Sequence, residues 1–336
     1  MNEIPPLLIE NIAKKNIVLF LGSGYLYNAK HPEERKAPLG PDLADKISDK
    51  FLNGSHKGSP LAFVADLAIS EANLFEVQSY IFEIFENFFP NESHYLFASL
   101  PWKAIFTTNY DLIVERSYYK NDKAIQDLSA VYRNTPQQQI FKSENTVPYY
   151  KLHGCISHIN DENLPLILST EQYIDHLHNR ERLFSKLKEL ASDFCILFVG
   201  YNNQDINIRT VLKELENLKD GKPRSYLVRP GVTEAEVRYW EARKITPIKM
   251  GYENFIKKVD QQISENDRKL SRFRVEVDKP IYERFQVNIE DLKPTESLIA
   301  FLEHESEYVH SSIASPNTEP QAFYRGYFED WGPIIK

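Results

Sequence analysis

Short apolar runs that end in glycine or polar residues recur along this chain and alternate with segments of helical periodicity. The first run, residues 16–21, is rich in β-branched residues and ends at Gly22-Ser23-Gly24, which predicts a buried strand entering a tight turn. Further strand-like runs lie at residues 102–107, 149–152, 164–168, 194–199, 225–228 and 245–249. Helical spacing is found at residues 204–218, 233–243 and 252–263. The alternation predicts an α/β fold with a Rossmann-like parallel sheet flanked by helices.

Residues 41–100 break this alternation. They contain no convincing strand, and amphipathic patterns follow one another at residues 42–52, 61–73 and 75–87. We therefore expect a helical insertion at about residues 41–100, within a domain that spans residues 1–265.

The pattern changes again after about residue 265. Phe273, Val275 and Val277 alternate with polar residues as in a half-exposed strand, residues 296–308 have helical spacing, and residues 311–320 have the composition of a linker. Five aromatic residues crowd the last segment, namely Phe323, Tyr324, Tyr327, Phe328 and Trp331. We expect residues 266–336 to form a small C-terminal extension. It either docks on the same domain or is a junction to a further domain or partner, because so many aromatic side chains need a surface to bury them.

Charge and hydropathy exclude several classes of partner. The formal net charge is -8 and no block of basic residues occurs, which argues against direct nucleic-acid binding. No stretch approaches the roughly 18 to 20 apolar residues that span a bilayer, and the first residues lack the layout of a signal peptide. We expect a cytoplasmic protein. Its two cysteines, Cys155 and Cys195, lie in apolar strand-like runs, where a thiol usually packs as a small hydrophobic side chain and no disulfide is expected.

The turn Gly22-Ser23-Gly24 follows a strand, so its backbone amides are candidates for approaching a pyrophosphate. The G-x-G-x-x-G fingerprint is not completed, because Tyr27 occupies the last position. Taken alone, the motif is more typical of a plain turn than of a cofactor loop.

Two further strand ends carry polar side chains. Thr108, Asn109 and Asp111 follow the run at residues 102–107, where open α/β sheets bind their ligands, although Asn109 or Asp111 can instead cap the next helix. His153 ends the run at residues 149–152 and is a candidate general base, with Gly154 allowing the backbone to turn. The other eight histidines have no comparable setting.

A third cluster follows the run at residues 194–199. Gly200 permits close approach of a ligand, Tyr201 comes next, and Asp205 is able either to cap the following helix or to bind a ribose hydroxyl. Four strand ends of one sheet therefore carry glycine, amide, imidazole or carboxylate groups. Their order predicts that they converge on one crevice.

The order G-S-G, T-T-N-Y-D, K-L-H-G and V-G-Y-N-N-Q-D resembles the sirtuin-like domains found in bacterial anti-phage defence proteins. Segments at residues 38–44, 168–173 and 239–248 extend the resemblance, which covers roughly residues 10–265. It implies an NAD⁺ hydrolase that cleaves the nicotinamide–ribose bond to give nicotinamide and ADP-ribose, and so depletes the cofactor during infection. It also implies a homo-oligomer and an ATPase or other sensor as fused domain or partner.

The resemblance also assigns roles to single residues. Asn109 and His153 match the catalytic pair of the family, and Asp111 matches the carboxylate near nicotinamide. Gly22, Ser23 and Gly24 match its phosphate turn, with Thr108 beside the catalytic asparagine as a further contact to the dinucleotide. Gly200, Tyr201 and Asp205 match the loop near the adenosine half of NAD⁺.

The chain departs from the protein-deacylating sirtuins in one respect. Those proteins carry four cysteines on a zinc ribbon, whereas this chain has two, neither in a C-x-x-C pair, so no metal is expected. Two alternatives to NAD⁺ hydrolysis stay open at this point. One is a binding module that senses NAD⁺ or ADP-ribose without cleaving it, and the other is an NAD⁺-dependent deacylase or ADP-ribosyl transferase.

Overall fold

The computed structural model describes residues 3–119, 121–143, 145–201, 223–264 and 268. The chain divides into two units, Met1–Phe273 and Arg274–Lys336, and all described residues belong to the first. The helix expected at residues 204–218 and every feature expected after residue 268 lie outside the described residues.

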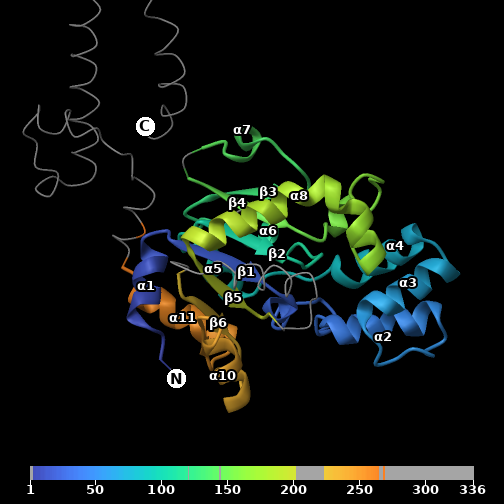
Figure 1. Ribbon diagram of the computed structural model, residues 1–336, viewed down its shortest axis with the longest axis horizontal. Coiled ribbons are helices and arrows are strands. Elements are labelled where there is room, and N and C mark those ends of the chain that lie inside the picture. Colours follow the sequence, from blue (N-terminus) through green and yellow to red (C-terminus); the bar gives the residue numbers. More distant parts are fainter. Residues whose placement is uncertain (1–2, 120, 144, 202–222, 265–267, 269–336) are drawn as a thin grey trace, which may run out of the picture. The chain divides into compact units, whose positions relative to one another are not determined.

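Seven strands of the described part form one sheet in which every pairing is parallel (Figure 1). The strands are β1 (Ile17–Leu21), β2 (Ala104–Thr107), β3 (Asp127–Val131), β4 (Thr146–Lys151), β5 (Cys195–Val199), β6 (Ser225–Val228) and β7 (Ile245–Ile248). Their order is β3-β4-β2-β1-β5-β6-β7. The prediction of a Rossmann-like α/β fold is confirmed, and the direction in which the sheet grows reverses at β1.

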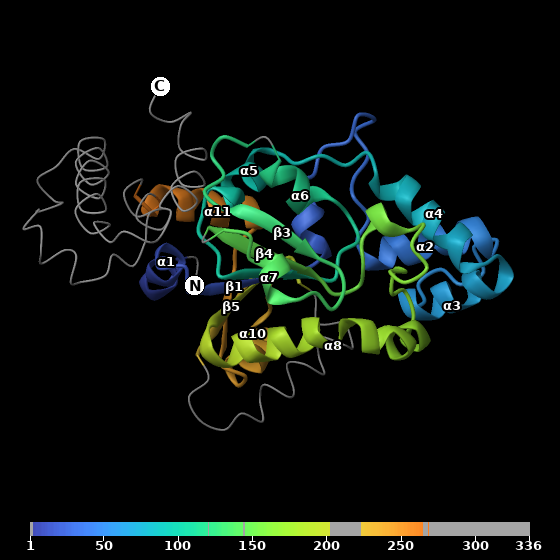
Figure 2. The ribbon, with the colours of Figure 1, turned by 90° about the horizontal axis from the view of Figure 1, so that it is seen from above.

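Helices cover both faces of this sheet. Figure 2 shows α8 (Thr170–Asp193) and α10 (Glu234–Glu241) on one face and α5 (Glu92–Ala98) and α6 (Ile113–Tyr118) on the other. The remaining helical elements are α1 (Pro6–Ala13), η1 (Ser23–Leu26), α2 (Gly40–Phe51), α3 (Leu61–Glu71), α4 (Leu74–Phe85), α7 (Gln137–Ile140), η2 (Ile156–His158) and α11 (Tyr252–Gln262).

Strand β1 explains why the first run of the sequence is apolar without interruption. Ile17, Leu19 and Leu21 belong to the core under α5 and α6, whereas Val18 and Phe20 belong to the core under α8. All five side chains are buried because successive residues of a strand point to opposite faces, and both faces are covered.

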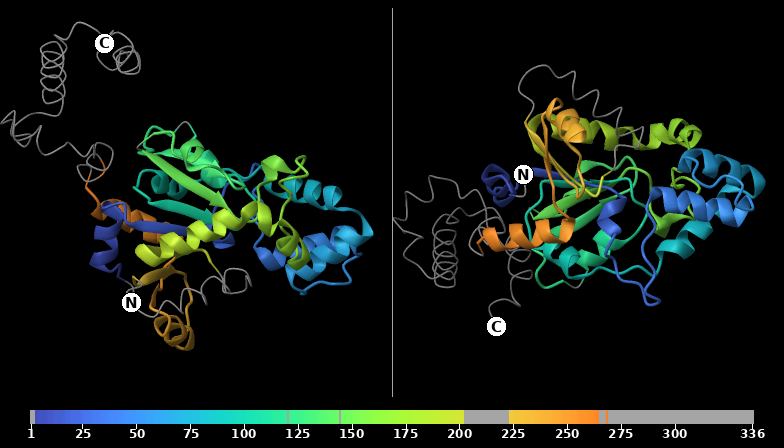
Figure 3. Two further views of the ribbon diagram at one scale, coloured as in Figure 1. Left: turned by 45° about the horizontal axis from the view of Figure 1, so that its top comes forward. Right: turned by 90° about the horizontal axis from the view of Figure 1, so that it is seen from below.

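The three amphipathic patterns of residues 42–87 coincide with α2, α3 and α4. Figure 3 shows these helices as a group beside one end of the sheet. Helix α4 begins at a capping residue, because the Asn73 side chain accepts a hydrogen bond from the amide of Glu76 at 2.9 Å.

Three elements differ from the expectations. Residues 164–168 are not a strand. Strand β3 was not predicted, because it lies at an edge of the sheet and its residues are mostly only part-buried, so its polar composition resembles a loop. Helix α8 was also missed as an element of its own, although Ser169 and Gln172 form a capping box at its start, which is a sequence signal for a helix.

Among the described helices, none is long and apolar enough to cross a membrane. Both cysteines are free. The described residues contain no group of three or more histidine, cysteine, aspartate or glutamate side chains placed to hold a metal ion.

Candidate functional site at the carboxyl edge of the sheet

The register of four neighbouring strands brings the expected residues to one level. Leu21 of β1 pairs with Thr107 of β2 and Val199 of β5, and Thr107 pairs with Lys151 of β4. Two residues beyond these positions stand Ser23, Asn109, His153 and Tyr201. The four strand ends therefore meet at the point where the sheet reverses its direction of growth, which is where open α/β sheets bind ligands.

The loops after β1 and β5 touch through backbone atoms. Gly22 and Gly24 donate their amides to the carbonyls of Val199 and Gly200, both at 2.9 Å. A Cβ atom on Gly200 would lie 2.2 Å from the amide nitrogen of Tyr25, and Gly200 has a φ of +63°. In this structure the two turn amides are thus engaged by the protein itself, and the glycines serve the close approach of two loops.

Asn109 is tied to the glycine turn. Its Nδ2 donates to the carbonyl of Gly22 at 3.1 Å, and its own amide donates to the Thr107 hydroxyl at 3.0 Å. The Thr107 hydroxyl in turn donates to the carbonyl of Leu21 at 2.9 Å. Asn109 is half-buried, and its side chain is held across the β1–β2 boundary at the level of the turn.

Asp111 satisfies one free amide at the start of α6 from the position before the N-cap residue, Leu112, which has no side-chain cap of its own. Its Oδ1 accepts a hydrogen bond from the amide of Ile113, the first residue of α6, at 2.9 Å. The carboxyl is buried, and burial raises its pKa above the ordinary value, while the Lys151 ammonium acts in the opposite direction.

Lys151 is a fully buried charge that sequence reasoning did not single out. Its Nζ donates to the carbonyl of Asp111 and to Glu115 Oε1 at 3.1 Å, and it lies 3.1 Å from Cys155 Sγ. Burial lowers the pKa of Lys151, but Glu115, Cys155 and Asp111 together outweigh it and raise that pKa. The ammonium therefore fastens the loop after β2 to the end of β4.

His153 is buried at the end of β4, and its backbone turns at Gly154, which has a φ of +89°. The carbonyl of His153 accepts a hydrogen bond from the amide of Ile167 at 3.0 Å. The hydroxyl of Tyr110 donates to the carbonyl of the same residue, Ile167, at 2.8 Å. Ile167, in the loop after β4, thus forms hydrogen bonds with both His153 and Tyr110, the residue next to Asn109.

The loop segment at residues 165–167 is fixed from two helices. Gln78 of α4 accepts the amide of Leu166 at 2.6 Å, and Arg180 of α8 donates to the carbonyl of Pro165 at 2.6 Å. These bonds explain why the apolar run at residues 164–168 is not a strand: its polar backbone groups are paired with side chains and loops. Burial lowers the pKa of Arg180 to about 10, because its guanidinium is enclosed.

The residues expected near adenosine are only partly described. Tyr201 is buried, and its ring packs against Phe20 and Phe198 with centroids 5.6 Å apart in both pairs. Asp205 lies outside the described residues.

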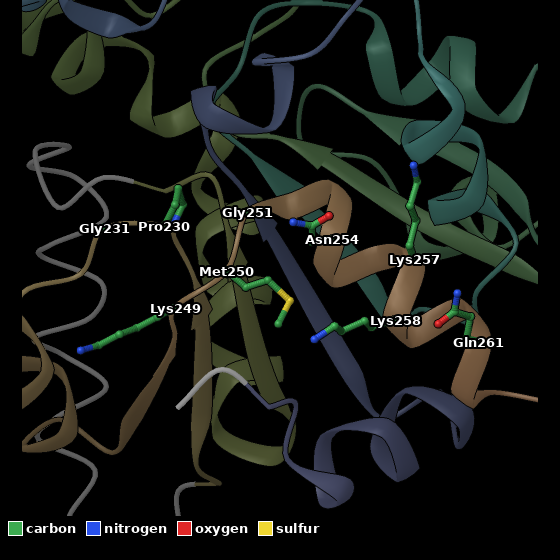
Figure 4. Close-up of a pocket in the computed structure, with 9 residues that line it drawn as sticks. All are labelled: Pro230, Gly231, Lys249, Met250, Gly251, Asn254, Lys257, Lys258 and Gln261. Atoms are coloured by element: carbon green, nitrogen blue, oxygen red, sulfur yellow. The ribbon is translucent and has the colours of Figure 1, made fainter.

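A pocket of about 580 Å³ lies at the ends of β6 and β7 and along α11 (Figure 4). Lys249, Lys257 and Lys258 give it a basic lining, although Lys249 is paired with Glu234 at 2.7 Å. None of its lining residues was expected from the motifs. The candidate site is therefore defined by the convergence of four strand ends and not by this pocket.

The parallel sheet and the residues at its point of reversal define a Rossmann-like α/β protein. Residues 103–248 match the family model of the SIR2-like domain. This match confirms the resemblance to sirtuin-like domains.

Curated relatives are similar at low identity. NAD(+) hydrolase ThsA of Bacillus cereus is 22% identical over 253 residues, which cover 71% of this chain and 50% of that protein. NAD(+) hydrolase ThsA of Enterococcus faecium is 26% identical over 129 residues, 37% of this chain and 25% of that protein. Defense-associated sirtuin 2 of Bacillus subtilis is 21% identical over 232 residues, 66% of this chain and 21% of that protein. The chain thus spans at most about half the length of these relatives.

Proposed function

We propose that this protein is an NAD⁺ hydrolase that cleaves the nicotinamide–ribose bond and releases nicotinamide and ADP-ribose, with Asn109 and His153 as its catalytic pair. The observation that carries the proposal is the register that aligns Asn109 with His153, two residues beyond paired positions of adjacent strands. The names of the relatives, NAD(+) hydrolase and Defense-associated sirtuin, support the same reaction and a role in anti-phage defence by NAD⁺ depletion.

The chemistry of the bond explains why an amide and an imidazole suffice. The pyridinium becomes neutral as the glycosidic bond breaks, so nicotinamide leaves without a strong acid catalyst. The enzyme must instead orient the ribose, stabilise an oxocarbenium-like transition state and deliver water. In this proposal Asn109 holds a ribose hydroxyl or the water, and His153 accepts the proton, a contribution typically worth about 10²- to 10⁴-fold.

The other site residues support this pair. Asp111 contributes a buried carboxyl group in the same loop as Asn109, where its ionised form favours the developing positive charge. Ser23 stands at the level of Asn109 on the neighbouring strand end, and Thr108 directly precedes Asn109 in the same loop. The contact of Gly22, Gly24 and Gly200 forms the floor of the proposed binding site. Asp205 stays a proposal for the adenosine ribose.

We also propose the assembly that the resemblance implies. The protein acts in the cytoplasm as a homo-oligomer, and an ATPase or other sensor, fused or bound, controls it. Residues 266–336 are the proposed extension or junction to that further domain or partner.

Product analysis tests the reaction directly. Purified protein is incubated with NAD⁺, with and without the product of the neighbouring gene, and nicotinamide and ADP-ribose are separated by chromatography. Asn109→Ala and His153→Ala are each expected to remove most nicotinamide release, by about 10²-fold or more. Their circular dichroism and melting temperature are expected to match the wild type.

Matched controls are Asn160→Ala, which changes an exposed asparagine, and His56→Ala, which changes a histidine of the α2–α3 connection. Both are expected to keep wild-type turnover. Near-normal turnover by both site variants contradicts the assignment of the catalytic pair. NAD⁺ binding by calorimetry without nicotinamide release in any assembly supports a sensor instead, and release that requires an acylated peptide supports a deacylase.

A further inference from the structure

Tyr110 lies between Asn109 and Asp111 in the loop after β2, and its side chain reaches the loop that follows β4. Its hydroxyl donates to the carbonyl of Ile167 at 2.8 Å, and the amide of Ile167 donates to the carbonyl of His153 at 3.0 Å. The two hydrogen bonds use the opposite backbone groups of one residue. They form a short bridge from the neighbour of Asn109 to His153.

The middle of this bridge has little freedom to move. The preceding amide, of Leu166, donates to Gln78 on α4 at 2.6 Å, and the carbonyl of Pro165 accepts from Arg180 on α8 at 2.6 Å. Gln78 and Arg180 are both buried. A segment held from two helices transmits the position of one loop to the other, because it does not yield when either loop shifts.

The bond from Tyr110 to Ile167 lies in a dry environment. Tyr110 and Ile167 are 8% and 3% exposed, so water does not readily replace the phenol if its hydroxyl is removed. A phenylalanine at this position keeps the ring and its packing and removes only the donor. The carbonyl of Ile167 then loses the partner that fixes it to the loop of Asn109.

We propose that Tyr110 is a positioning residue, which sets the distance between Asn109 and His153 through Ile167 without touching the substrate. This inference rests on the NAD⁺ hydrolase function proposed above. Catalysis that depends on a water held between an amide and an imidazole is sensitive to small displacements, since a shift of about 1 Å can cost about 10²-fold in rate. Binding of NAD⁺ is spread over many contacts and is less sensitive.

Tyr110→Phe tests the inference, with Tyr252→Phe as its matched control. Tyr252 also donates its hydroxyl to a backbone carbonyl, that of Ser93 at 3.1 Å, but this bond joins α11 to α5. We expect Tyr110→Phe to lower kcat by about tenfold or more while KM for NAD⁺ changes by less than about twofold. Tyr252→Phe is expected to keep the wild-type kcat with a similar change in melting temperature.

Amide hydrogen exchange supplies a readout that does not depend on activity. In Tyr110→Phe, exchange is expected to accelerate in the peptide that contains Ile167 and to stay unchanged in the peptide that contains Gly22. A wild-type kcat in Tyr110→Phe overturns the positioning role. So does an equal loss of kcat in Tyr252→Phe, because the effect then follows stability alone. A wild-type protein that releases no nicotinamide in any assembly refutes the proposed function itself, and exchange still reports whether the bridge forms.

Discussion

At the carboxyl edge of the sheet, the loops after β1 and β5 meet through backbone, whereas the loops after β2 and β4 are joined by side chains in addition to a backbone bond from the amide of Ile156 to the carbonyl of Tyr110 at 3.0 Å. In the first pair, three glycines bring main-chain atoms together, and no side chain intervenes between Gly24 and Gly200. In the second pair, the Tyr110 hydroxyl donates to the carbonyl of Ile167, and the Lys151 ammonium donates to the carbonyl of Asp111.

We call the loops after β1 and β5 the glycine half of the candidate site and the loops after β2 and β4 its polar half. The two halves are sensitive to opposite kinds of substitution. The glycine contact is sensitive to atoms that are added, because a Cβ has no room there. The polar contact is sensitive to atoms that are removed, because buried carbonyls and carboxylates then lose their donors. Asn109 joins the two halves, since its Nδ2 donates to the carbonyl of Gly22. A change in either half is therefore expected to reach the candidate catalytic amide.

The largest effect on the free energy of unfolding is expected from Gly200→Ala, which places a side chain in the contact of the glycine half. The new Cβ meets the backbone of Gly24 and Tyr25 and holds a left-handed φ, so we expect a loss of about 4 kcal/mol in unfolding free energy. Chemical denaturation measures it. Gly231→Ala is the control, because Gly231 has a φ of +68° with no atom within 4 Å, and it is expected to cost about 1 kcal/mol. Equal losses of unfolding free energy in the two variants would show that backbone strain at a positive φ causes the loss at Gly200, and not the close contact with Gly24 and Tyr25.

A smaller effect is expected from Lys151→Met, which challenges the polar half. The substitution leaves Glu115 without its ammonium partner and the carbonyl of Asp111 without a donor, so we expect a loss of about 3 kcal/mol. The control is Lys14→Met, which breaks the exposed pair with Glu10 and is expected to cost less than about 0.5 kcal/mol. Urea titrations of both proteins make the comparison. A stable Lys151→Met protein would mean that backbone contacts hold this half as well.

The smallest of the three effects concerns acid. His94 is buried beneath the glycine turn, and its Nε2 pairs with the carbonyl of Tyr25 at 2.9 Å. Burial lowers the pKa of His94 to about 4, although the Tyr25 carbonyl and Glu253 act in the opposite direction. The unfolded chain then binds a proton near its ordinary pKa of 6.5, while the folded chain stays neutral. The contribution of neutral His94 to the free energy of unfolding is thus fully present above pH 6.5 and is lost as pH falls towards 4.

Between pH 7 and pH 5 this linkage amounts to about 2 kcal/mol. His94→Gln removes the titration, so its unfolding free energy is expected to fall less over this interval than that of the wild type. Other groups titrate in both proteins, and the difference between the two slopes isolates His94. Parallel plots of unfolding free energy against pH would show that His94 does not contribute to the loss of stability in acid.

The placement of the candidate site residues was predictable because they stand where strands end. The runs before Gly22, Asn109, His153 and Gly200 are apolar and short, and the polar or glycine residues after them mark the carboxyl edge of a parallel sheet. The supporting residues gave no such signal. Gln78 and Arg180 lie in amphipathic or polar helical segments, and nothing in their immediate neighbours indicates that they contact residues 165–167.

Residues 164–168 illustrate the remaining gap. Their apolar composition is that of a buried strand, yet they belong to none of the seven strands of the described sheet, and their backbone pairs with side chains and loops. Composition reports that a segment is buried, and it does not report which groups accept its hydrogen bonds. Strand β3 shows the converse, because an edge position tolerates polar side chains in a strand.

The sequence by itself determined the alternation of strands and helices, the two-sided burial of β1 and the residues that close each strand, because these depend on neighbours along the chain. Only the tertiary structure decided that Gly22 and Gly24 pack against Gly200, that Lys151 is buried against Glu115, and that Ile167 connects Tyr110 to His153. The physical reason is separation. Such contacts join residues tens to hundreds of positions apart, and their energies depend on distances and burial that arise only when the sheet and its helices have assembled.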